Sequence, residues 1–160
     1  MPFQLPKESR EYFKHLFRRA DGGARFDTLF DQYYFCLMVG LSRKLLAAET
    51  DIESDKFVEG YPSDYQNQAD VIAGLLINAE LSRKGIEKDD RSSIEQEMLR
   101  ILDQNSPTRL SEEGMRLLNL YAATGFKVIR EGITPPQNLE EFLVLYHGLW
   151  PSEEGVGVQT

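Results

Sequence analysis

The stretch DTLFDQYYFCLMVGLSRKLLA, residues 27–47, decides the fold. When its residues are placed on a helical wheel, apolar side chains fall on almost every face, which is typical of a helix surrounded by other helices. No proline interrupts it, and Asp27 stands where a helix N-cap is expected. The sequence therefore predicts a central apolar helix here, with the lone cysteine Cys36 buried in it as an inert thiol.

Other segments on both sides of this helix repeat their apolar residues at three- and four-residue spacing. Start signals stand at Ser63, Ser111 and Asn138. Residues 48–62 lack this periodicity and predict a long connection whose order the sequence leaves open. No hairpin signal flanked by alternating apolar residues is present. We expect further helices at about 6–19, 63–85, 90–104, 111–132 and 138–149.

The fold class predicted is all-α, a single-domain bundle of five to six helices around the central apolar helix. Its domain would cover residues 1–150, followed by a flexible C-terminal tail at 151–160. The chain of 160 residues, 41% of them hydrophobic, has room for one globular core, and a single cysteine excludes a disulfide-stapled fold. It shows no signal peptide and no apolar run of membrane-spanning length, so we expect a cytoplasmic protein without a membrane partner.

Charge is distributed unevenly along the chain. The net charge is -8, yet residues 1–44 hold eight basic and five acidic side chains, whereas the remainder holds ten and twenty-one. On a continuous first helix, Lys7, Arg10, Lys14 and Arg18 would form one basic stripe. With Arg19 and Arg25 nearby, this stripe could contact a phosphate backbone or an acidic protein surface. Basic residues late in helices, such as Lys127 and Arg130, are explained by the helix dipole.

Candidate catalytic and metal-binding groups are sparse. The two histidines, His15 and His147, have no fixed partner at recognisable spacing. Asp27 and Asp31, one turn apart, are better explained as cap and first-turn acid than as metal ligands. We therefore predict no catalytic residue, cofactor or metal. Catalysis would require a pocket in which His147, Asp31 or Glu80 converge with a displaced pKa.

Several helical segments resemble a known group of proteins. They are Phe26–Tyr34 with Gly40, Ser111–Met115, Asn119–Ala122 and Asn138–Leu143. These segments are similar to small helical proteins encoded beside bacterial DNA-modification and phage-defence systems, especially those associated with DNA phosphorothioation. The resemblance implies an accessory role in such a system, and it transfers no functional residue to this chain.

Two functional hypotheses follow. The first is a non-catalytic accessory or adaptor subunit that binds a larger protein of a prokaryotic DNA-modification or phage-defence machine. The alternative is a nucleic-acid-binding module that uses the basic stripe. Mimicry of DNA by the acidic remainder of the chain is a third option, although ten basic residues are interspersed among its acids. The sequence does not identify the partner or the oligomeric state, and it does not exclude an active site without a motif.

Overall fold

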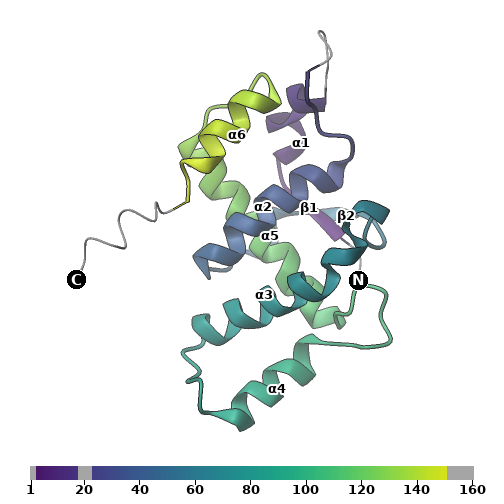
Figure 1. Cartoon of the computed structure of the whole chain (residues 1–160), viewed down its shortest axis with the longest axis vertical. Helices are drawn as coiled ribbons and strands as arrows, with labels where there is room; N and C mark the ends of the chain where they lie inside the picture. Colours follow the sequence, from purple (N-terminus) through teal and green to yellow (C-terminus); the bar gives the residue numbers. More distant parts are fainter. Residues whose placement is uncertain (1–2, 18–22, 151–160) are drawn as a thin grey trace, which may run out of the picture.

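The computed structural model describes residues 3–17 and 23–150, and this part of the chain is mostly helical (Figure 1). In chain order the elements are β1 (Phe3–Pro6), α1 (Ser9–Tyr12), the 3-10 helix η1 (Lys14–Phe17), α2 (Leu29–Arg43), η2 (Glu49–Asp51), β2 (Ile52–Val58), η3 (Ser63–Gln68), α3 (Ala69–Arg83), α4 (Arg91–Ile101), α5 (Glu112–Gly132) and α6 (Leu139–His147). The prediction of a predominantly helical chain is confirmed. The all-α class is wrong, because β1 and β2 form an antiparallel sheet.

The helices α2 and α5 pack in the middle of the molecule and touch through their backbones. A Cβ atom on Gly125 would lie 1.6 Å from the Cys36 carbonyl oxygen, and one on Gly40 would lie 1.7 Å from the Tyr121 carbonyl oxygen. Only glycine at both positions allows this approach. The predicted central helix is confirmed as α2, with Cys36 buried. It shares the centre with α5, more than half of whose residues are buried.

The small sheet closes one side of this core. Phe3 and Leu5 of β1 are fully buried, and the ring of Phe3 packs edge-on against those of Phe30 and Tyr33 at 5.0 and 5.4 Å. The strands pair irregularly, with Phe3 opposite Val58. The predicted connection 48–62 is therefore structured over much of its length, by η2 and β2.

The first predicted helix, 6–19, does not form as one helix. The Lys7–Glu8 turn follows β1, and Glu8 takes a left-handed conformation with φ 71°. Helix α1 then covers a single turn before Phe13 ends it and η1 begins. The buried Ser9 hydroxyl donates to the Pro6 carbonyl at 2.7 Å, which stabilises the turn instead of a continued helix.

Local capping explains where the later helices begin. Ser111 Oγ accepts from Gly114 N at 3.0 Å and Asn138 Oδ1 from Glu141 N at 2.8 Å, as predicted. Two cap predictions are wrong. At α2 the carboxylate of Asp31 accepts from the backbone nitrogens of Asp27 and Thr28, so Asp27 is not the side-chain cap. The segment beginning at Ser63 is first a 3-10 helix, and α3 starts only at Ala69.

The remaining helices lie at opposite ends of the α2–α5 pair. Figure 1 shows α1 and α6 at the top and α3 and α4 at the bottom. The predicted tail, 151–160, lies outside the described residues, as do Arg18 and Arg19.

Candidate functional site

The predicted basic stripe depends on a continuous first helix, and this geometry is wrong. Lys7 lies in the turn after β1, Arg10 in α1 and Lys14 at the start of η1, so the three do not share one helix face. Arg18 and Arg19 fall in a part of the chain that the structure does not describe. Whether these residues bind a partner stays a prediction.

Two basic residues of the predicted stripe, and the nearby Arg25, have acidic neighbours. Arg10 Nε lies 3.1 Å from both carboxylate oxygens of Glu53. Lys14 pairs with Glu11, whose pKa this hydrogen bond lowers, and Arg25 Nε lies 3.5 Å from Asp27 Oδ1. A nucleic-acid phosphate would have to compete with these carboxylates.

The most deeply buried carboxylate in the lower part of the molecule is that of Glu80, which is 0% exposed. It accepts hydrogen bonds from Arg83 Nε at 2.6 Å, from Tyr121 Oη at 2.7 Å and from Arg100 Nη2 at 3.2 Å. Burial by itself would raise the pKa of Glu80, but the hydrogen bonds from Arg83 and Tyr121 bring it down to about 2. A permanently charged, fully paired carboxylate of this kind holds helices together and does not transfer protons near neutral pH.

The network continues through Arg100, which also donates to Glu97 at 2.7 Å and to Glu113 at 2.9 Å. Lys84 Nζ donates to Glu97 at 2.6 Å. These contacts join α3, α4 and α5. Because Glu97 and Ile101 are the only buried residues of α4, ionic contacts supply much of what attaches this helix.

The groups considered for catalysis do not converge. Asp31 caps α2 and accepts a hydrogen bond from Tyr65, Glu80 lies in the ionic network, and His147 is exposed in the last turn of α6. Burial raises the pKa of Cys36, in keeping with an inert thiol. Within residues 3–17 and 23–150, no group of three histidine, cysteine, aspartate or glutamate residues could hold a metal ion.

Exposed aliphatic side chains gather on α6. Leu143, Val144 and Leu145 are 40%, 73% and 43% exposed, whereas Leu139 and Phe142 are buried. Phe142 and Tyr146 attach the helix to Phe35 of α2, at ring distances of 5.7 and 4.9 Å. The other end of the molecule has exposed aliphatic residues on α3 and α4, of which Leu99 is 81% exposed.

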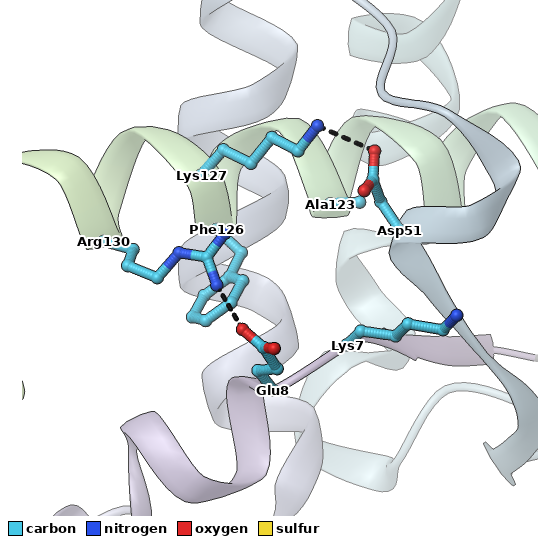
Figure 2. A pocket seen from close by; sticks show the side chains of 7 residues that line it. All are labelled: Lys7, Glu8, Asp51, Ala123, Phe126, Lys127 and Arg130. Atoms are coloured by element: carbon cyan, nitrogen blue, oxygen red, sulfur yellow. Dashed lines mark hydrogen bonds and ion pairs between the residues drawn. The ribbon is translucent and has the colours of Figure 1, made fainter.

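A small pocket with a cationic wall lies between the Lys7–Glu8 turn, η2 and α5 (Figure 2). Its volume is about 150 Å³, and it is lined by Lys7, Glu8, Asp51, Ala123, Phe126, Lys127 and Arg130. Arg130 Nη1 donates to Glu8 Oε2 at 2.5 Å, and Lys127 Nζ lies 2.7 Å from Asp51 Oδ2. The hydrogen bond from Lys127 lowers the pKa of Asp51. The Asp51 carboxylate thus stays ionised around neutral pH.

Sequence reasoning missed this pocket and the exposure of α6. Lys127 and Arg130 stand three residues apart, a spacing that places both on one helix face, but the helix dipole is a competing explanation for basic residues at this end of a helix. For α6, the uninterrupted apolar run from Phe142 to Tyr146 was a usable signal, because five consecutive residues of a helix point to all sides and a helix at the edge of a bundle is covered on only some of them.

Comparisons of the chain with protein-family models, curated proteins and solved structures found no match. Of the helices in the described part of the chain, none combines the length and the apolar character that crossing a membrane requires.

Proposed function

We propose that this protein is a non-catalytic adaptor that binds a larger protein through the exposed face of α6. The observation that carries the proposal is that α6 is apolar around most of its circumference, whereas Leu139 and Phe142 are its only buried residues. A helix with this composition is ordinarily buried on all sides. An exposed apolar cluster on such a helix is a typical contact surface for another protein.

The geometry of the cluster favours a groove on the partner. Leu143, Val144 and Leu145 are consecutive, so their side chains span roughly 200° around the helix axis. A flat surface reaches only one side of a helix, whereas a groove encloses it from several sides. Glu140 and Glu141 are exposed in the first turn of α6, and they favour basic residues at the rim of that groove.

The resemblance to proteins encoded beside DNA-modification and phage-defence systems supplies the expected context. The partner would be a larger subunit of such a prokaryotic machine, and the complex would form in the cytoplasm. The absence of a continuous first helix supports this choice over the nucleic-acid alternative, because Lys7, Arg10 and Lys14 do not lie on one helix face.

Site-specific photocrosslinking tests the proposal. A photoreactive residue at position 144 should capture one partner protein in the native host, identified by mass spectrometry. The same residue at position 99, the most exposed leucine of α4, is the matched control and should not capture it. Val144→Glu should abolish co-purification of that partner, whereas Leu99→Glu should leave it intact.

Two results would overturn the adaptor role. Crosslinks from position 144 only to a second copy of the chain would make α6 a self-association surface. Salt-dependent DNA binding that disappears on charge reversal of Arg10 and Lys14, together with no captured protein, would favour the nucleic-acid alternative.

A further inference from the structure

We propose that the pocket between the Lys7–Glu8 turn, η2 and α5 binds a phosphate dianion, either free or as the phosphoryl group of a small molecule. The bound group would replace the Glu8 carboxylate at Arg130. This inference is independent of the adaptor role, because no residue of α6 lines the pocket.

The donors of the site are fixed by α5. Arg130 and Lys127 are one helical turn apart, and the Arg130 guanidinium lies over the Phe126 ring, 5.0 Å from its centre. The hydrogen bond to Glu8 engages one of the five N–H groups of the guanidinium. The contact with Asp51 likewise engages one of the three N–H groups of Lys127. Both cations therefore keep donors for a second acceptor.

The two carboxylates differ in how firmly they are held. Asp51 Oδ2 also accepts from Ala48 N at 2.9 Å, which anchors it to η2. The Glu8 side chain is 74% exposed, and its ion pair with Arg130 is of the kind that contributes little in water. Glu8 is thus the carboxylate that a stronger anion displaces.

Charge and size select the ligand. With Glu8 displaced, the residues that line the pocket carry three positive charges, on Lys7, Lys127 and Arg130, and one negative charge, on Asp51, so two positive charges are left to be neutralised. Figure 2 shows Lys7 extended away from Arg130 and without an ion pair to the other residues drawn, and its long side chain is free to rotate toward a ligand. A volume of about 150 Å³ is enough for a phosphoryl group.

Phosphate fits these donors better than a carboxylate does. Its oxygens point in several directions, so one can accept from Arg130 while others accept from Lys127 and Lys7. Arginine in particular presents paired N–H groups that match two oxygens of one phosphate.

Titration with inorganic phosphate at constant ionic strength tests the proposal, with binding followed by backbone amide NMR shifts and calorimetry. Shifts should concentrate around residues 7–8, 51 and 123–130. Arg130→Gln and Lys127→Gln should each weaken binding at least about tenfold, the loss expected for a charge-assisted hydrogen bond. Lys14→Gln, which removes a cation that also pairs with a nearby glutamate, is the matched control and should leave affinity unchanged.

Glu8→Gly gives a test with the opposite sign. Glycine adopts the left-handed backbone of position 8 without strain, so this variant removes the competing carboxylate and keeps the turn. Phosphate affinity should rise by about fivefold. An unchanged or weaker affinity would show that Glu8 does not occupy the ligand position and would overturn the proposal.

Two further ligands identify the source of the phosphate. A sugar phosphate that binds more tightly than inorganic phosphate would show that the ligand is a phosphorylated small molecule, whereas equal affinities would show that the free anion suffices. Binding only of a single-stranded DNA without terminal phosphates would overturn the assignment, as would shifts that spread over the whole surface.

Discussion

Replacing Gly125 by alanine should force α2 and α5 apart. The added Cβ atom would lie 1.6 Å from the Cys36 carbonyl oxygen and 2.8 Å from Gly40 N, whereas ordinary van der Waals contact begins at 3.4 Å. Both obstacles are backbone atoms within helices, so no side-chain rotation relieves the clash. The helices must separate by nearly 2 Å along this line, the difference between 3.4 and 1.6 Å.

The cost of this separation exceeds the gain in helix propensity. Alanine in place of glycine inside a helix contributes about 1 kcal/mol. A gap of only about 0.5–1 Å already removes a quarter to a half of the dispersion attraction between packed atoms. Overpacked cores lose about 1–3 kcal/mol or more, so we expect Gly125→Ala to lower the free energy of unfolding by at least about 3 kcal/mol. That is a large part of the roughly 5–15 kcal/mol available to a domain of this kind.

Urea denaturation followed by circular dichroism measures this loss, and the chain contains its own control. Gly74 lies inside α3, and a Cβ atom there would meet no heavy atom within 4 Å in the described structure. Gly74→Ala should therefore stabilise the protein by about 1 kcal/mol and raise Tm by about 2–4 °C. If Gly125→Ala proved as stable as the parent protein, the close approach of α2 and α5 would not exist.

Three other measurements probe the lower helices. Glu80→Gln should lower the free energy of unfolding by about 3 kcal/mol, because it breaks a buried ionic cluster, and denaturant titration at pH 7 would show the loss. The folded-state pKa of Glu80 is lowered from 4.5 to about 2, so its contribution is complete above pH 4.5 and disappears as the pH falls toward 2. This amounts to as much as about 3 kcal/mol, and acid titration of Glu80→Gln should lack the corresponding decline. Ser111→Ala removes the cap of α5 and should cost about 1 kcal/mol in thermal or urea unfolding; an unchanged midpoint would contradict the capping geometry.

The helices were predictable because their signals are local. The Ser111 and Asn138 caps depend on a backbone nitrogen three residues away, and the apolar spacing of α2 and α5 lies within each segment. Strand β1 was not predictable in this way, because its stability comes from distant groups. Gln4 N donates to Asn119 Oδ1, and β2 pairs with β1 across about fifty residues of chain.

The candidate sites were predictable only in part. The pocket joins residues 7–8, residue 51 and one face of α5, and nothing in the sequence indicates that these three segments meet. Lys7 was selected from the sequence for a stripe that does not form, yet it lines the same pocket as Lys127 and Arg130. The exposure of α6 depends on how the other elements pack around it, which is a property of the whole fold and cannot be predicted from the segment itself.

The two proposed sites consist of different residues, so an experiment can refute one proposal without affecting the other. Val144 projects from α6 and does not line the pocket, so Val144→Glu should leave phosphate affinity unchanged while it abolishes partner capture. Arg130→Gln should do the reverse. If Arg130→Gln also abolished capture while circular dichroism showed an intact fold, the pocket and α6 would belong to one extended interface, and the phosphate would be contributed by the partner or required for its binding.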